Sequence, residues 1–96
     1  MQFGHLKLAD GSVISVQASS FHYCTPREDF APEYSEVEVA SFGKSIPELA
    51  EFSEGIADPE DPQAVWVYPY TPTERVEALI AARGGLAEHL GKRVLL

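Results

Sequence analysis

The sequence predicts an α+β fold: a single small domain with a mostly antiparallel sheet of four or five strands and two helices on one face. Three observations lead to this fold class. A β-hairpin signal opens the chain, a stretch with period-two hydrophobicity lies near its middle, and a helix with clear start and stop signals follows later. Because 96 residues can build only one modest core, residues 1–96 are expected to form one domain.

The first predicted element is a β-hairpin around the turn signal Asp10-Gly11. Its strands are expected over Phe3–Leu8 and Ser12–Ala18. A three-residue loop with Gly11 in the left-handed conformation sets Leu6 opposite Ile14, and Gly4 opposite Val16. This register gathers the apolar residues Leu6, Leu8, Ile14 and Val16 on one face. A two-residue loop would instead place Leu6 opposite Ser15, so we predict the three-residue loop.

A long loop over Ser19–Ser35 follows, with two prolines and several aromatic residues that are expected to pack on the domain or on a partner. The next stretch alternates with period two and predicts a strand from Glu36 to about Phe42. Its two valines, Val37 and Val39, should face inward, while Glu36 and Glu38 share the other face.

A short helix is predicted to start at Ser45, which would be its N-cap, with Glu48 completing a capping box and Pro47 in the first turn. The helix should end before Gly55. Its buried side would be supplied by Ile46, Leu49, Ala50 and Phe52.

The most apolar stretch, Ala64–Tyr68, predicts a central strand that ends at Pro69. A second capping box, Thr71 with Glu74, predicts a helix from about Pro72 to Arg83 that is terminated by Gly84-Gly85. One more helical turn over Leu86–Leu90 and a last short strand over Lys92–Leu96 complete the expected order.

The acidic residues are concentrated in one part of the chain. Between Glu28 and Asp61 there are eleven carboxylates and a single lysine, a net charge of −10, whereas the whole chain carries −8. A pI of about 4.6 argues against direct binding of nucleic acid, since phosphates require Lys and Arg. Such a concentration of charge fits a partner protein with a basic surface.

Two binding surfaces can be proposed from the sequence. The first is an acidic partner-binding surface made of Glu36, Glu38, Glu48, Glu51, Asp58, Glu60 and Asp61, with Phe21, Tyr23 and Phe30 as aromatic anchors. The alternative is a small-ligand pocket that clamps a base and a phosphate of a nucleotide signal between Tyr23, Arg27, Tyr68 and Tyr70.

Catalysis and cofactors are not expected. His22-Tyr23-Cys24 is the nearest approach to a reactive site, but no third group that would orient the histidine can be chosen. The acidic stretch Asp58–Pro62 lacks the spacing of a calcium loop, and no paired zinc-ligand motif is present. We therefore predict a protein that is not an enzyme and binds neither a metal nor a cofactor.

A cytoplasmic location is expected. The N-terminal residues lack the basic-then-apolar pattern of a signal peptide, and no apolar run approaches the length of a membrane span. The single cysteine, Cys24, offers no disulfide framework.

The chain resembles small phage- or prophage-encoded proteins of unassigned function. The resemblance is carried by Leu8–Ser19, Phe21–Arg27, Tyr34–Val39 and Trp66–Tyr70. It implies an accessory role in infection, such as that of anti-CRISPR proteins, which disable bacterial defence by occupying a basic nucleic-acid channel. On this analogy the partner would be a nucleic-acid-binding defence complex of the bacterial host, with the acids standing in for phosphates.

Overall fold

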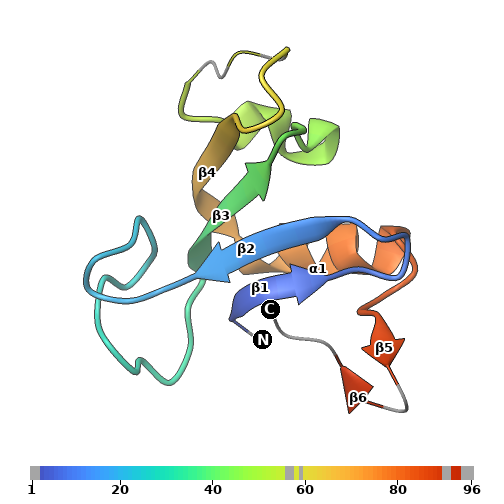
Figure 1. Ribbon diagram of the computed structural model, residues 1–96. Coiled ribbons are helices and arrows are strands. Elements are labelled where there is room, and N and C mark those ends of the chain that lie inside the picture. The colour runs from blue at the N-terminus through green and yellow to red at the C-terminus, as the bar shows by residue number, and fades with distance from the viewer. Residues whose placement is uncertain (1–2, 56–57, 59, 90–91, 94–96) are drawn as a thin grey trace.

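The computed structural model describes residues 3–55, 58, 60–89 and 92–93. Four strands form one antiparallel sheet in the order β1-β2-β3-β4, and two short strands pair separately. The elements are β1 (Gly4–Lys7), β2 (Val13–Gln17), β3 (Glu36–Phe42), the 3₁₀ helix η1 (Pro47–Phe52), β4 (Val65–Pro72), α1 (Thr73–Ala82), β5 (Glu88–His89) and β6 (Lys92–Arg93). Figure 1 shows the sheet strongly twisted, with β1 and β2 lying across the direction of β3 and β4.

The predicted hairpin register is confirmed. Leu6 pairs with Ile14 and Gly4 with Val16. Gly11 has a φ of +93°, and the Leu8 N–H donates to the Ser12 carbonyl at 2.8 Å, which closes the three-residue loop. Gly11 allows this backbone conformation without steric cost.

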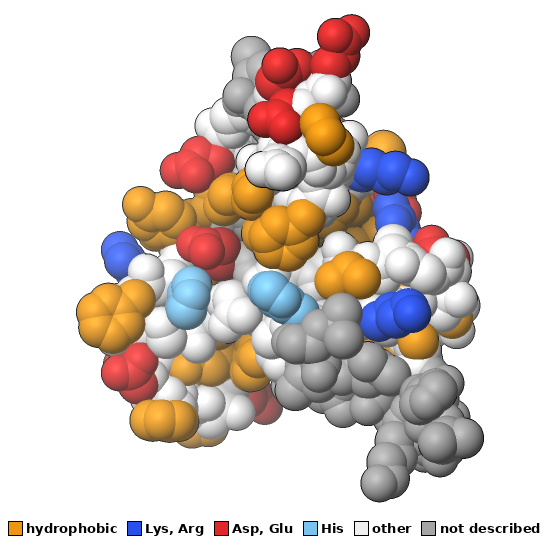
Figure 2. Space-filling model, in the orientation of Figure 1, with side chains coloured by type: hydrophobic (Ala, Val, Ile, Leu, Met, Phe, Trp, Pro, Cys, Tyr) orange, Lys and Arg blue, Asp and Glu red, His pale blue; other side chains and the backbone are white. Residues whose placement is uncertain are grey.

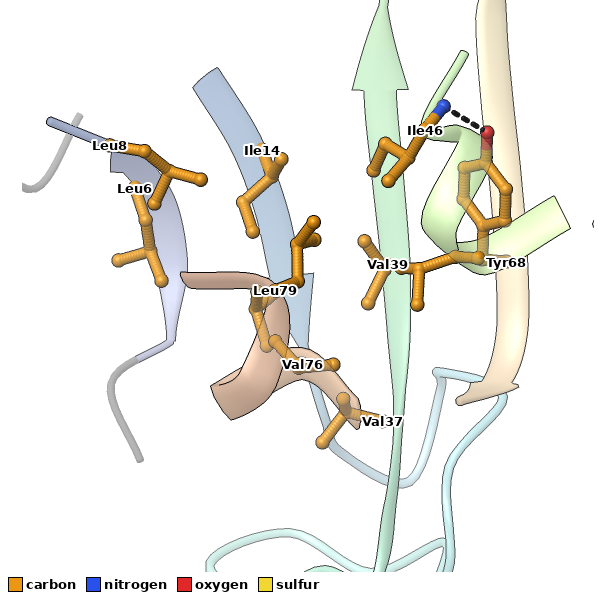
Figure 3. Close-up of a cluster of buried hydrophobic side chains, with 11 residues drawn as sticks. Leu6, Leu8, Ile14, Val37, Val39, Ile46, Tyr68, Val76 and Leu79 are labelled. Atoms are coloured by element: carbon orange, nitrogen blue, oxygen red, sulfur yellow. Dashed lines mark hydrogen bonds between the residues drawn. The ribbon is translucent and has the colours of Figure 1, made fainter. Parts of the chain in front are cut away.

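The core lies on one face of the sheet, where alternate residues of β1, β2 and β3 point inward (Figure 3). Val37 and Val39 are buried as predicted, and Glu36 and Glu38 stay partly exposed. Leu49 of η1, together with Val76 and Leu79 of α1, belongs to the same buried cluster. Each fully buried aliphatic side chain of this kind stabilises the fold by roughly 1.5–3 kcal/mol.

The prediction of a central strand that ends at Pro69 is wrong. β4 is an edge strand and continues through Pro69 to Pro72. Proline is tolerated there because its missing N–H does not interrupt the ladder of an edge strand. The pairing with β3 shifts register between Val37 and Val39, and nearby Tyr70 has a φ of +51°. Beyond this irregularity the pairing resumes at Thr71 and Pro72, directly before α1 begins.

Neither predicted N-cap is observed. Ser45 makes no capping contact, and η1 begins at Pro47 without a side-chain cap. Thr71 is fully buried and donates its hydroxyl to the Tyr68 carbonyl at 2.9 Å, while α1 begins at Thr73. A hydrogen bond to the preceding strand residue Tyr68 therefore takes the place of helix capping by Thr71.

The end of α1 is confirmed at Gly84-Gly85, both with positive φ. The Gly85 N–H donates to the Ile80 carbonyl at 2.8 Å, as in a Schellman cap. The expected further turn over Leu86–Leu90 is wrong within the described residues, because Leu86 instead bridges to Leu8 and a strand begins at Glu88. Leu90, the last residue of the expected turn, and residues 94–96 of the predicted final strand lie outside the described residues.

Both edges of the main sheet are partly covered by neighbouring chain. Beside β1, Ala9 N–H donates to Gly85 and Ala87 N–H to Lys7; beside β4, Glu54 N–H donates to Val67. Such cover limits pairing with another strand. Among the residues that the structure describes, none of the helices has the length and apolar character needed to span a bilayer.

Candidate functional site

The sheet face opposite the core carries exposed apolar side chains. Phe42 of β3 pairs with Val65 of β4, and both side chains are 47% exposed. The Phe42 ring also meets the His5 ring at a centroid distance of 5.4 Å. Figure 2 shows this face, with hydrophobic and histidine side chains near its middle and acidic side chains gathered at the tip. We call Phe42, Val65, Val67, Tyr70 and Tyr23 the open-face patch.

Two acids predicted to bind a partner hold the aromatic loop against β3. The Glu38 carboxylate accepts from the Tyr23 N–H at 3.0 Å, and the Glu36 carboxylate accepts from the Thr25 hydroxyl at 2.6 Å. Thr25 also bridges to the backbone of Glu36. Glu36 and Glu38 therefore serve loop attachment, with their remaining acceptor capacity facing solvent.

The aromatic loop presents its rings outward. Phe21 is 85% exposed and Phe30 is 99% exposed, the latter at a φ of +56°. A bulky residue rarely occupies that conformation, and such outliers concentrate at functional sites. Tyr23 contacts Tyr70 at a ring distance of 5.9 Å and lies under the Arg27 guanidinium at 5.3 Å.

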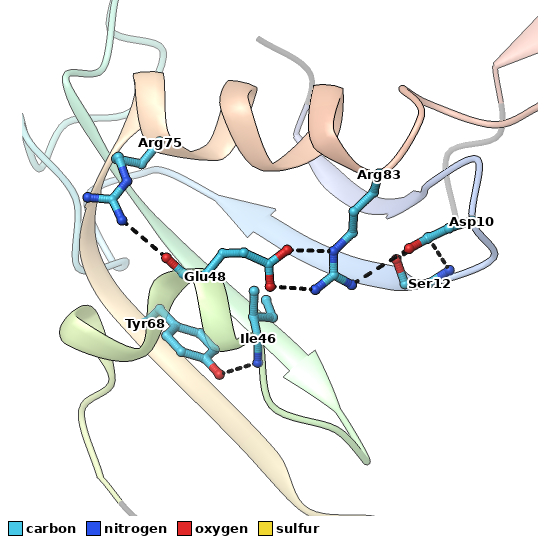
Figure 4. Close-up of polar contacts among 7 residues, drawn as sticks. All are labelled: Asp10, Ser12, Ile46, Glu48, Tyr68, Arg75 and Arg83. Atoms are coloured by element: carbon cyan, nitrogen blue, oxygen red, sulfur yellow. Dashed lines mark hydrogen bonds and ion pairs between the residues drawn. The ribbon is translucent and has the colours of Figure 1, made fainter.

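Arginines of α1 and its C-cap engage the two acids of η1, and Figure 4 shows the contacts of Glu48. Glu51 pairs with Arg75 at 2.7 Å, and Glu48 receives two hydrogen bonds from Arg83. The hydrogen bond from Arg83 is the main reason that the pKa of Glu48 lies below its ordinary value, and the same contact raises the pKa of Arg83. These two carboxylates contribute little uncompensated charge to a partner surface.

The loop after η1 retains exposed, unpaired acids. Asp58 accepts from the Glu60 N–H at 3.0 Å and Asp61 from the Gln63 N–H at 2.8 Å, which are local turn contacts that leave the charges in place. Asp58, Glu60 and Asp61 make no ion pair with any residue that the structure describes. This loop is the acidic tip seen in Figure 2.

The predicted acidic surface is therefore divided by role: Glu36 and Glu38 attach the loop, Glu48 and Glu51 are paired with arginine, and Asp58, Glu60 and Asp61 form the free acidic tip.

In the alternative ligand site, the structure brings together Tyr23, Arg27 and Tyr70 but not Tyr68. Tyr68 is 1% exposed and accepts the Ile46 N–H at 2.7 Å inside the core (Figure 3). Its inward position follows from its pairing with Val39.

The side chains of His22 and Cys24 have different partners, although the Cys24 N–H donates to the His22 carbonyl at 3.0 Å. Nδ1 of His22 lies 2.6 Å from the Ser19 hydroxyl, and the buried Cys24 thiol donates toward the carbonyls of Ser19 and Pro26. Within the described part of the chain, no group of three or more His, Cys, Asp or Glu side chains is placed to hold a metal ion.

Sequence reasoning missed the contribution of Phe42, Val65 and Val67. The available signal was the apolar character of both faces of Ala64–Tyr68, which was attributed to a central strand. With the geometry known, comparison shows that no family model, curated protein or solved structure matches this chain.

Proposed function

We propose that this chain is a non-enzymatic interaction protein, a phage-type inhibitor that binds a basic, nucleic-acid-binding surface of a bacterial defence protein. The observation that carries the proposal is the open-face patch: half-exposed aromatic and aliphatic side chains on a sheet face, next to an acidic tip and an outward-facing aromatic loop. Exposed apolar patches rimmed by polar residues are typical of protein interaction sites.

The arrangement of the helices supports this role. We infer that η1 and α1 cover the same face of the sheet, because Leu49, Val76 and Leu79 share one buried cluster. Among the residues that the structure describes, the part of the opposite face over β3 and β4 keeps exposed apolar side chains that a partner could contact. An antiparallel sheet that packs one face on the core can expose its other face to solvent.

Charge and apolar contact would have separate tasks in binding. The free acids of the tip, within a chain of net charge −8, would speed encounter with a basic surface. The open-face patch and the rings of Phe21 and Phe30 would then exclude water and slow dissociation, as buried aromatic anchors do in other interfaces. The resemblance to small phage proteins suggests the defence complex as the target.

The competing proposal is a binder of a nucleotide signal through the Arg27-Tyr23-Tyr70 stack. It is favoured by the guanidinium and two rings lying together at the surface. A base could stack on the tyrosines while the guanidinium pairs with a phosphate. The two proposals differ in which substitutions should abolish binding.

The test is capture of a partner from bacterial lysate, followed by binding measurements with the purified partner. Phe42→Ser combined with Val65→Thr removes apolar area from the open face without touching the core, and should abolish capture. Glu74→Gln with Glu77→Gln, on exposed positions of α1, is the control and should keep capture intact. Retention by the Phe42/Val65 variant, with loss in Arg27→Ala and displacement by nucleotide, would support the competing proposal instead.

A further inference from the structure

We propose that the cavity between the β1–β2 turn and the turn after β3 binds a small organic anion through a carboxylate or phosphate group. The cavity measures about 790 Å³, within the range of small-molecule sites. It is lined from both sides, by Asp10–Ile14 on the hairpin and by Ser41–Ile46 after β3, with Arg83 contributing from the end of α1. The site does not rest on the proposed interaction function.

A buried hydroxyl without a partner points to a ligand. Ser41 lines the cavity and is only 4% exposed, yet its Oγ has no hydrogen-bond partner among the described residues. Buried polar groups in folded proteins are nearly always satisfied, and leaving one unpaired is destabilising. This hydroxyl is closed to solvent as the side chain stands, and rotation of the Ser41 side chain toward the cavity would let a ligand oxygen satisfy it.

The unused hydrogen-bonding capacity around the cavity consists mainly of donors. Lys44 makes neither an ion pair nor a side-chain hydrogen bond with the residues that the structure describes. Arg83 directs Nε and Nη2 to Glu48, which leaves Nη1 at 4.0 Å from Asp10 (Figure 4).

The single lining carboxylate is already engaged. Asp10 accepts from the Ser12 N–H at 3.0 Å and from the Ser12 hydroxyl at 2.6 Å, which lowers the pKa of Asp10. With Ser41, Lys44 and Arg83 able to donate, the complementary group is an acceptor. Carboxylates and phosphates are the acceptors that guanidinium and ammonium groups bind best.

The ligand should also carry a short apolar body. Ile14 and Ile46 are buried and line the same cavity as the donors. The rim is held in place near Gly43, which has a φ of +77°, donates its N–H to the Ala64 carbonyl at 2.7 Å and approaches the Pro62 carbonyl too closely to accept a Cβ. A fixed rim around apolar walls and a few polar groups is the usual construction of a small-molecule site.

The experiment is a titration of the isotope-labelled protein followed by backbone amide NMR signals. Four matched probes are added: benzoate, phenyl phosphate, benzyl alcohol and benzylamine. We expect the signals of residues 11–14 and 41–46 to shift with the two anions and not with the neutral or cationic probe. The tighter of the two anions identifies the natural oxyanion. Absence of shifts with both anions up to about 10 mM, or equal shifts with benzyl alcohol, would overturn the proposal.

Two variants locate the site. Ser41→Ala and Lys44→Gln should each weaken binding of the preferred anion by roughly tenfold, the loss expected for one hydrogen bond to a charged group. Lys7→Gln, an exposed lysine on β1 that does not line the cavity, is the matched control and should bind as the wild type. Lys44→Gln changes an exposed side chain, so it tests the proposal even where Ser41→Ala alters the fold. Unchanged affinity in both variants would reject the site.

Discussion

Arg83 and Glu48, 35 residues apart in the chain, face each other through two parallel hydrogen bonds. Arg83 Nη2 donates to Oε1 of Glu48 at 2.9 Å, and Nε donates to Oε2 at 3.1 Å. Because Arg83 caps α1 and also faces Asp10 on the hairpin turn, this contact joins three elements that are distant in sequence (Figure 4). An acid from the acidic stretch between Glu28 and Asp61 thereby stabilises the fold.

The first prediction concerns the pH dependence of stability. The pKa of Glu48 in the folded protein is lowered from its ordinary value of 4.5, chiefly by the hydrogen bond from Arg83. Its contribution to stability is therefore present above pH 4.5 and is lost as the pH falls through the lower folded pKa. Glu48→Gln should lower the free energy of unfolding by about 1 kcal/mol or less at pH 7, since the pair is partly exposed.

Urea unfolding at pH 7 and pH 3 measures this difference. The gap between wild type and Glu48→Gln should shrink at pH 3, because that pH lies below the ordinary pKa of 4.5 and part of the stabilisation by the carboxylate is lost there. Glu33→Gln, at an exposed position with no ion pair in the described structure, is the control. A gap that stays the same at both pH values would contradict the assigned role of the Glu48 carboxylate.

The second prediction tests the position of Tyr68. Its hydroxyl accepts the buried Ile46 N–H, so Tyr68→Phe leaves that donor unpaired. The free energy of unfolding should fall by roughly 1–3 kcal/mol. Tyr23→Phe removes a hydroxyl from an exposed side chain and should have little effect. Equal thermal melts for the two variants would argue against a buried Tyr68.

The third prediction separates a buried threonine from a helix cap. Aspartate is a preferred N-cap residue, so Thr71→Asp would be tolerated if Thr71 capped the helix. In the structure Thr71 is fully buried and bonded to the Tyr68 carbonyl, so a carboxylate there would be strongly destabilising. Loss of the cooperative thermal transition in Thr71→Asp is expected, and a wild-type melting temperature would restore the capping interpretation.

The parts of the fold that could be predicted are those set by local rules. Asp10-Gly11 and the alternation around it determined the hairpin register, and Gly84-Gly85 determined the end of α1. The helix starts could not be read from capping patterns, because Thr71 takes its partner from Tyr68. The position of β4 also depended on tertiary structure, since an apolar strand looks the same when its outer face is covered and when it is open.

The candidate site was predictable only in its composition. The acidic residues were identified from the sequence, but their roles depend on contacts across long separations, such as Glu48 with Arg83 and Tyr23 with Glu38. Among the proposed ligand residues, Tyr68 was misplaced because the bulge near Tyr70 changes which side chains share a face. The charged side chains can be counted in a sequence, but the ion pairs and hydrogen bonds that compensate their charges depend on the fold.

The fourth prediction concerns the turn after β3. At Gly43 a Cβ would lie 2.8 Å from the Pro62 carbonyl oxygen, and the φ of +77° already disfavours other residues. Gly43→Ala should therefore lower the free energy of unfolding by roughly 1–3 kcal/mol. Gly55→Ala meets open space at an ordinary φ and serves as the control. Urea unfolding of the two variants measures the difference, and equal stabilities would contradict the described close approach.

The final prediction tests electrostatic steering by the acidic tip. Glu60→Gln with Asp61→Asn removes two charges while keeping the side-chain oxygen that Asp61 offers to the Gln63 N–H, so the loop geometry should persist. Association with the captured partner should slow by roughly three- to tenfold at low salt, because long-range attraction to a basic surface is weakened. The difference in association rate between wild type and variant should narrow as salt rises, since exposed charges are screened over about 8 Å at physiological ionic strength.

Glu74→Gln with Glu77→Gln removes the same charge from α1 and should change the association rate less. The measurement is the association rate as a function of salt concentration for the wild type and the two variants. Equal slowing in both variants would attribute the effect to net charge alone. No slowing in either variant would show that the acidic tip does not steer binding.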